Sequence, residues 1–280
     1  PLHPGRLRQR GYDQALELLQ QVIAQTAEQE AFIGIRADAL RDSGIVFIRQ
    51  VNYEEARRHS LLALQLYRQL GDRYGEGNVI NNLGVIEWYA ENNLSGAKAY
   101  FEQDLAICRE LGNLHGETHA LGNLGYVAVG MGQTAEAERL YQGSLERYRH
   151  AGDRYQEAWT LNSLAELAMQ QGRYYAMKSF CEEALPICRE INSRWLEGSL
   201  LVTLGLAYEA MGAYETAVQH LQAGLTAKRE VGEAYAVVIT VVYLARVWVK
   251  LEDFRAADEA IQEGLMLARE DNDPLMIAEA

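Results

Sequence analysis

The amino-acid sequence predicts an all-α protein in which antiparallel helix pairs stack one after another into a solenoid. Three observations favour this fold class: an internal repeat of about 40 residues, apolar side chains at helical spacing, and helix-end signals that close each unit. The composition agrees, because only 4 of the 280 residues are proline and 49% are hydrophobic. Such a chain can form long helices and bury a sizeable core.

The repeat is marked by a leucine that is followed directly by a small residue. This pair recurs as Leu83-Gly84, Leu124-Gly125, Leu164-Ala165, Leu204-Gly205 and Leu244-Ala245. An alanine about thirteen residues later, such as Ala137, and a large side chain one turn after it, such as Tyr141, belong to the same pattern. Two helices approach closely only where side chains are small, so these positions predict the contact within each pair. A single pair cannot bury its apolar face alone, and neighbouring pairs must therefore stack.

Helix ends are indicated by a glycine or asparagine followed by a capping residue, as in Gly71-Asp72 and Asn192-Ser193. Glycine and asparagine tolerate the left-handed conformation that ends a helix, and Asp, Asn or Ser can cap the next one. These signals predict a leading helix at 12–28, repeats at 30–70, 74–111, 115–150, 155–190, 195–230 and 234–270, and the start of a further helix at 273–280. Both ends then stop within a repeat, so we expect residues 1–280 to be one solenoid and part of a longer protein.

Leucine-glycine, then alanine, then a large residue one turn later resembles the tetratricopeptide repeat over residues 12 to about 270. The usual unit has about 34 residues. The longer unit is similar to the arrays of kinesin light chains, spindle-orientation adaptors and the sensor regions of bacterial STAND-type regulators. The resemblance implies a right-handed superhelical solenoid in which the first helix of each repeat lines a concave groove.

No arrangement of side chains in the sequence predicts catalysis. The phosphate-binding motif G-x-x-x-x-G-K-[ST] and the nucleophile motif G-x-S-x-G are both absent. His115 and His119 flank Glu117, but zinc proteases carry H-E-x-x-H, and no third ligand is evident. We therefore expect a protein that is not an enzyme and that needs no metal or cofactor.

The cysteines, the charge and the hydropathy limit location and partners. Cys108, Cys181 and Cys188 include no C-x-x-C pair and stand at core positions of the repeat, which predicts buried thiols in a reducing cytoplasm. No apolar run approaches the ~18 residues of a membrane span. The net charge of −13 repels phosphate backbones. We expect a cytoplasmic protein that neither binds nucleic acid directly nor enters a membrane.

The resemblance implies that ligand contacts come from the residue before the leucine-glycine pair and from positions one turn to either side. On this sequence, the concave-face residues selected in that way are Asn78, Asn82, His119, Asn123, Tyr126, Trp159, Ser163, Glu166, Thr203, Tyr243 and Arg246. An asparagine amide can both donate to and accept from a peptide backbone, which suits this role. Alternatively, the asparagines bond to neighbouring helices.

The leading functional prediction is a protein-interaction or ligand-sensing module of a multidomain signalling or regulatory protein, which binds a peptide or protein segment in the groove. Other domains of the parent chain are further candidates as partners. Two alternatives stay open: a free-standing scaffold or adaptor, and a sensor that binds a small-molecule inducer. A nucleotide-binding segment upstream in the parent gene would favour the sensor over the scaffold.

Overall fold

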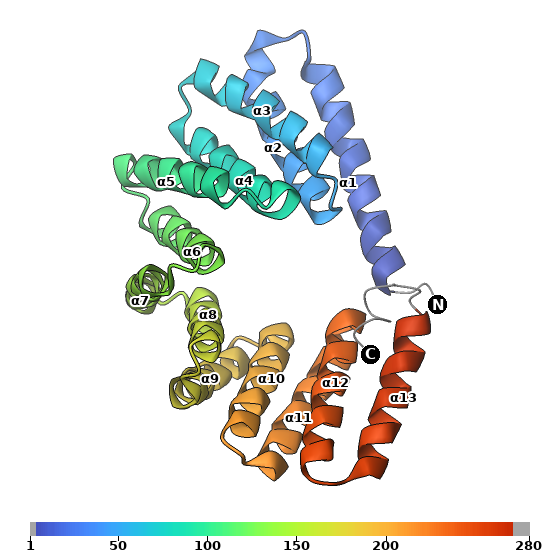
Figure 1. Cartoon of the computed structure of the whole chain (residues 1–280). Coiled ribbons are helices and arrows are strands. Elements are labelled where there is room, and N and C mark those ends of the chain that lie inside the picture. Colours follow the sequence, from blue (N-terminus) through green and yellow to red (C-terminus); the bar gives the residue numbers. More distant parts are fainter. Residues whose placement is uncertain (1–3, 271–280) are drawn as a thin grey trace. The chain divides into compact units, whose positions relative to one another are not determined.

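The computed structural model describes residues 4–270, which form thirteen α-helices and one short 3-10 helix but no strand (Figure 1). The prediction of an all-α fold is confirmed. The helices are α1 (Pro4–Thr26), η1 (Glu30–Phe32), α2 (Ile33–Arg49), α3 (Tyr53–Leu70), α4 (Arg73–Glu91), α5 (Leu94–Glu110), α6 (Leu114–Gly130), α7 (Thr134–Ala151), α8 (Arg154–Gln170), α9 (Tyr174–Glu190), α10 (Arg194–Ala210), α11 (Tyr214–Val231), α12 (Ala234–Lys250) and α13 (Phe254–Glu270). Helix α1 begins at Pro4 rather than at residue 12. The helix expected at 273–280 lies outside the described residues.

The chain divides into two compact units, Pro1–Ser144 and Leu145–Ala280, with the boundary inside α7. In the first unit, consecutive helices from α1 to α6 pack against one another. In the second unit, the same holds from α8 to α13, and α10 also contacts α8 and α12. The first helices of successive repeats are therefore neighbours within the second unit. One continuous solenoid over 1–280 stays a prediction.

Close contact within a helix pair depends on the small residue after the repeat leucine. A Cβ atom added to Gly84 on α4 would lie 2.6 Å from the ring of Phe101 on α5. The same atom on Gly125 would lie 2.5 Å from the ring of Tyr141, and on Gly205 it would lie 2.6 Å from Leu221. The space that the glycine leaves is thus filled by the large side chain of the second helix, which explains the spacing in the sequence.

The segments between repeats end one helix and cap the next, as the sequence predicted at most of these sites. Gly71 ends α3 with a φ of 69°, and the Asp72 carboxylate accepts the Gly75 N–H at 2.9 Å. Ser193 is an exception, because its side chain makes no capping hydrogen bond at the start of α10. That part of the prediction was wrong.

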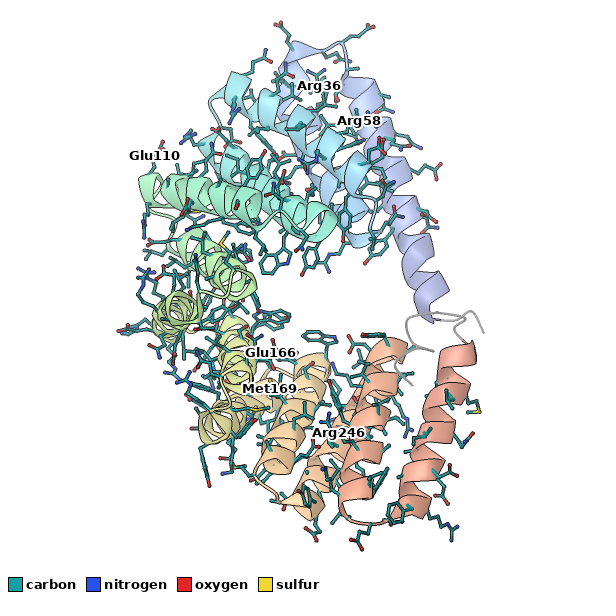
Figure 2. The ribbon with its side chains drawn as sticks, viewed as in Figure 1. Arg36, Arg58, Glu110, Glu166, Met169 and Arg246 are labelled. Carbon is teal, nitrogen blue, oxygen red and sulfur yellow. The ribbon has the colours of Figure 1, made fainter. Side chains whose placement is uncertain are left out.

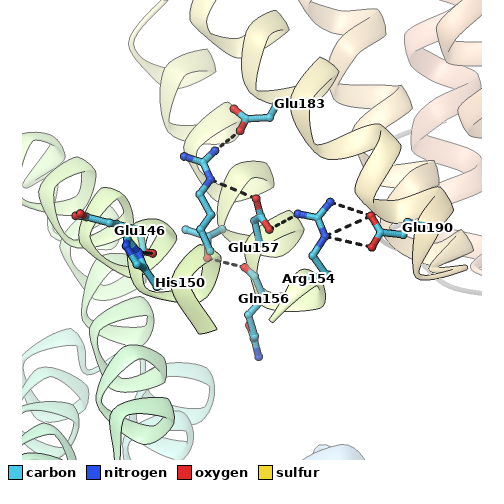
Figure 3. Close-up of polar contacts among 9 residues, drawn as sticks. Glu146, His150, Arg154, Gln156, Glu157, Glu183 and Glu190 are labelled. Carbon is cyan, nitrogen blue, oxygen red and sulfur yellow. Dashed lines mark hydrogen bonds and ion pairs between the residues drawn. The ribbon is translucent and has the colours of Figure 1, made fainter. Parts of the chain in front are cut away.

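Arginine–glutamate ion pairs link consecutive helices near the ends of the repeats, and Figure 3 shows one such cluster. Arg154, at the start of α8, pairs with Glu157 of its own helix at 2.6 Å and with Glu190 at the end of α9 at 2.8 Å. Arg149 of α7 pairs with the same Glu157 at 3.2 Å. The arrangement recurs in two further clusters, formed by Arg68, Arg73, Glu76 and Glu110 and by Arg189, Arg194, Glu197 and Glu230.

Candidate partner-binding faces

A polar row of four half-buried side chains lies on α4 and α6 and is termed the α4–α6 face: Asn78, Asn81, His119 and Asn123. The Nδ2 of Asn123 donates to Oδ1 of Asn81 at 2.7 Å and lies 3.5 Å from Nδ1 of His119. The structure therefore brings the predicted residues Asn123 and His119 together with Asn81. It also shows Asn123 bonded to a neighbouring helix, which was the alternative role considered for the asparagines.

His119 contributes a neutral ring to the α4–α6 face. Burial and the neighbouring His115 lower the pKa of His119 below its ordinary value of 6.5. At pH 7 the imidazole is therefore uncharged and offers one N–H donor and one acceptor nitrogen.

The two other predicted asparagines, both on α4, differ in accessibility. Asn78 lines a cavity beside His119. The Nδ2 of Asn82 is shielded from solvent and has no hydrogen-bond partner among the described residues. The Asn82 amide nitrogen thus lies within the helix layer, where a peptide cannot reach it without a change of side-chain rotamer.

A cavity of about 280 Å³ lies between α4, α5 and α6 and is termed the α4–α6 cavity. Its polar lining includes Tyr74, Asn78 and Asn81 from α4, Asp104 from α5, and His115 and His119 from α6. Burial raises the pKa of Asp104 from its ordinary value of 3.8 to about 6, although a hydrogen bond from Cys108 acts in the opposite direction. The α4–α6 face and the α4–α6 cavity share three side chains, so a ligand on the face can reach the cavity.

Aromatic rings extend the α4–α6 face toward the ends of its helices. Tyr126 packs edge-on against Trp88, with ring centroids 5.8 Å apart, and against Tyr141 at 5.4 Å. Tyr89 stacks on Trp88 at 6.0 Å and is 66% exposed. The predicted residue Tyr126 therefore belongs to an aromatic cluster that can pack against apolar side chains of a partner.

In the second unit, Trp159 belongs to a stack of aromatic rings on α8 and α10. Its ring lies nearly parallel to that of Trp195, with centroids 5.2 Å apart and an interplanar angle of 10°, and the Tyr155 ring also stacks on it, with centroids 6.3 Å apart. Nζ of the buried Lys228 lies 4.8 Å from the centre of the Trp195 ring. The two half-buried tryptophans form an apolar plate that joins neighbouring repeats.

Two predicted contact residues of the second unit are buried. Ser163 is 3% exposed and Thr203 is 8% exposed. Their hydroxyl groups donate to backbone carbonyls of their own helices, that of Ser163 to Trp159 at 3.1 Å and that of Thr203 to Ser199 at 3.0 Å. The expectation that these side chains face a ligand is corrected, because their small size lets the neighbouring helices cover them.

Glu166 lies on α8, where Figure 2 labels it together with Met169. Its side chain is exposed, and its Oε1 accepts a hydrogen bond from Nδ2 of Asn162 at 2.7 Å. Crowding by protein atoms raises the pKa of Glu166 by desolvation, while the Asn162 bond acts in the opposite direction.

Tyr243 and Arg246, both on α12, line a cavity of about 480 Å³ together with Leu206, Glu209 and Lys250. The Arg246 guanidinium forms two hydrogen bonds to the Glu209 carboxylate, at 2.7 and 2.6 Å, and lies 5.1 Å from the Tyr243 ring centre. Because its charge is already paired, Arg246 offers a packing surface more than an anion site.

Sequence reasoning missed Asn81, Asp104 and Trp195. Asn81 directly precedes Asn82, and only the direction of the α4 side chains decides which of the two faces outward. Asp104 had a signal, because a carboxylate stands at a place where other repeats carry a small residue. Trp195 was not among the predicted contact residues, although its ring packs on that of Trp159.

Burial suppresses the reactivity of the three cysteines. Cys108, Cys181 and Cys188 are all buried, and desolvation raises the pKa of each thiol, to about 12, 12 and 11 respectively. Within residues 4–270, no group of three or more His, Cys, Asp or Glu side chains is arranged to hold a metal ion. None of the described helices combines the length and apolar character that crossing a membrane requires.

Several solved structures have the same fold as this chain. A Signal Transduction ATPase with Numerous Domains (STAND) protein with a tetratricopeptide repeat sensor, from Pyrococcus horikoshii, is 17% identical with a TM-score of 0.78; the match covers 95% of this chain and 39% of that one. The apo form of RapI is 13% identical with a TM-score of 0.73, and the match covers 95% and 94% of the two chains. A Rap protein complexed with competence and sporulation factor is 13% identical with a TM-score of 0.69, covering 94% and 72%. At these identities the likeness shows the fold alone.

The sequence itself was compared with family models and with curated proteins. No curated protein matched it. The tetratricopeptide repeat model matches residues 35–110, 116–174 and 156–230, which together make up more than half of the chain. The repeat pattern, the paired helices and this match lead to one conclusion: the chain belongs to the tetratricopeptide repeat family.

Proposed function

We propose that this chain is the ligand-sensing module of a cytoplasmic regulatory protein and that it binds an extended peptide segment on the α4–α6 face. The tetratricopeptide repeat is a protein-interaction module, and no side-chain arrangement described above supports a catalytic role. The observation that carries the proposal is the row of amide and imidazole groups on α4 and α6 beside the Trp88–Tyr126 rings.

This row suits an extended peptide because each of its groups can both donate and accept. The Asn123 Oδ1 accepts no hydrogen bond from the described residues, and Asn78 lies beside the cavity with its amide half-buried. A peptide backbone presents alternating N–H and C=O groups, which such side chains can satisfy without demanding a particular sequence. The aromatic cluster then adds an apolar contact.

Two of the structural neighbours support a regulatory role by analogy. One carries its tetratricopeptide repeats as the sensor of a STAND protein, and another was solved with competence and sporulation factor bound. This chain spans 39% of the length of the STAND protein. The proposed module would then control a domain attached elsewhere in the same protein. This role is inferred by analogy, from similarity of fold.

A selection from a phage-displayed library of random peptides on the whole chain tests the proposal. The affinity of a selected peptide is then measured by fluorescence anisotropy against wild-type protein and the double variant Asn81→Ala, Asn123→Ala. We expect about tenfold weaker binding, because the variant removes two amide groups of the α4–α6 face. Helicity should be unchanged, because both partners of the Asn81–Asn123 hydrogen bond are removed together and neither is left unpaired. Gln103→Ala, an exposed amide on α5, serves as the control and should bind normally.

Equal affinity of the double variant and wild type would place the peptide elsewhere and refute the assignment of the α4–α6 face. If no peptide is enriched and small molecules raise the melting temperature instead, the module is an inducer sensor. A folded chain that responds to neither would favour the scaffold alternative.

A further inference from the structure

Asp104 differs in chemistry from the residues that occupy its place in other repeats. It follows the large side chain Phe101 of α5 by one turn, at the contact between α5 and α4. The residues at the corresponding place in α3, α7, α9 and α11 are Ala63, Ser144, Ala184 and Gly224. A carboxylate at this site is therefore not needed to build the helix pair.

The Asp104 carboxylate is buried without a cation. Its side chain is 5% exposed, and its one hydrogen bond among the described residues comes from the Cys108 thiol at a distance of 3.5 Å. No described lysine or arginine pairs with it, and none lines the α4–α6 cavity. Burying a charge without a partner destabilises a fold, so an unpaired carboxylate in this place indicates a binding site.

The surrounding residues leave room for such a ligand instead of closing over the carboxylate. Gly77 of α4 faces Asp104, and a Cβ atom there would lie 3.3 Å from the Asp104 Oδ1 and 3.2 Å from Ile107. Gly116 of α6 also lines the cavity. The cavity has a volume of about 280 Å³, at the lower limit of pockets for drug-sized ligands. Its size suits a single side chain.

We propose that the α4–α6 cavity binds the cationic side chain of an arginine or lysine in the partner segment, with the Asp104 carboxylate as its counter-ion. Asn78, Asn81 and His119 line the cavity and also belong to the α4–α6 face, so a peptide on that face can direct one side chain toward Asp104. The inference names the partner's chemistry and rests on the proposed function for the claim that the cation belongs to a peptide.

Nuclear magnetic resonance titration of the isotope-labelled whole chain tests the site without a known partner. The probes are Nα-acetyl-arginine methylamide, its neutral citrulline analogue, Nα-acetyl-lysine methylamide, and n-butylammonium as a free amine. We expect the arginine probe to shift the amide signals of Gly77, Asp104 and Gly116 in a saturable way. The citrulline probe should bind at least about tenfold more weakly, because it lacks the charge that a hydrogen-bonded carboxylate recognises.

Two variants show whether Asp104 carries the binding. Asp104→Asn keeps the size of the side chain and should weaken the arginine probe at least about tenfold. Asp104→Ala introduces the residue found at this place in α3 and α9, and it serves if the asparagine variant does not fold. Equal binding of the arginine probe to wild type and either folded variant would overturn the proposal, as would equal binding of the citrulline probe.

The free amine separates the two sources of a cation. Tighter binding of n-butylammonium than of both the capped arginine and Nα-acetyl-lysine methylamide would assign the cavity to a small amine and overturn its assignment to a partner segment. A peptide that loses affinity for the Asn81 and Asn123 double variant but not for Asp104→Asn would refute the cation site and still support the proposed function. Binding of the arginine probe at Asp104 in a chain that selects no peptide would support the cation site and refute the proposed function.

Discussion

At the scale of single residues, Asp104 shows how a binding group opposes stability. Its ionised form is disfavoured by burial, as its raised pKa shows. A residue selected only for folding would be small and uncharged here, as Ala184 is on α9. Groups whose environment penalises their charged state are found preferentially at functional sites.

The first prediction concerns the stability of Asp104→Ala. The folded-state pKa of about 6 lies above the ordinary value of 3.8, so the neutral carboxyl group is the form that the fold favours. The stability that the neutral Asp104 carboxyl group contributes is fully present below about pH 4 and is lost as the pH rises through about 6, where the group ionises. We expect the variant to be more stable than wild type at pH 7 by roughly 1–3 kcal/mol, with the difference shrinking toward pH 4.

Urea unfolding of both proteins between pH 4 and pH 8 measures this difference. Glu102→Ala, an exposed carboxylate on the same helix, should show no comparable gain. A variant that is less stable than wild type at pH 7 would mean that Asp104 supports the fold, which contradicts our interpretation.

At the scale of helices, the arginine–glutamate clusters hold the ends of successive repeats together. Glu76 is 5% exposed and pairs with Arg68 at 2.8 Å and with Arg73 at 2.5 Å, so it joins α3 to the start of α4. The pattern is visible in the sequence. One arginine precedes the turn between repeats, a second arginine follows the turn, and a glutamate comes one helical turn after that second arginine. Without a structure these charges are indistinguishable from an ordinary solvated surface.

The second prediction is that Glu76→Ala destabilises the protein by roughly 1–3 kcal/mol at pH 7, because two arginines lose a partly buried partner. Burial alone would raise the pKa of Glu76, but the hydrogen bonds from Arg68 and Arg73 outweigh it and lower the pKa below 4.5. The stabilisation is therefore present above about pH 4.5 and lost as the pH falls through the lower folded-state value.

Thermal unfolding at pH 7 and pH 3 checks both parts of this expectation. The exposed pair Arg139–Glu136 provides the control, and Glu136→Ala should cost less than about 1 kcal/mol. If Glu76→Ala loses as little stability as the control variant, the arginine–glutamate clusters do not contribute measurably to the stability of the fold.

At the scale of the whole molecule, the net charge of −13 favours the approach of a basic partner. This charge acts at long range, whereas Asp104 acts only on contact. The two effects can be separated by their dependence on salt, because screening weakens attraction between separated charges more than it weakens a buried ion pair.

The third prediction is that an arginine-bearing peptide from the selection associates about tenfold more slowly when sodium chloride rises from about 0.02 to about 0.5 M. Its dissociation rate should change much less, because the contacts in the bound state are shielded from solvent. Stopped-flow fluorescence measures both rates. An association rate that is independent of salt would exclude steering by the acidic chain.

The sequence by itself determined the family, the number of helix pairs and the position of most helix ends, because each of these depends on neighbours close in the chain. The repeat leucine and glycine set the spacing of one helix pair, and Gly71 with Asp72 ends one helix and starts another through local hydrogen bonds. Such signals are legible without tertiary structure.

Only the tertiary structure decided which side chains a partner can reach. Ser163 and Thr203 match the family position for ligand contact yet are covered by neighbouring helices, and Asn123 is held by Asn81 from another repeat. The α4–α6 cavity depends on α4, α5 and α6 together, with Gly77 opposite Asp104. Accessibility is a property of how helices pack, and a helical period in the sequence gives the direction of a side chain but not what lies in front of it.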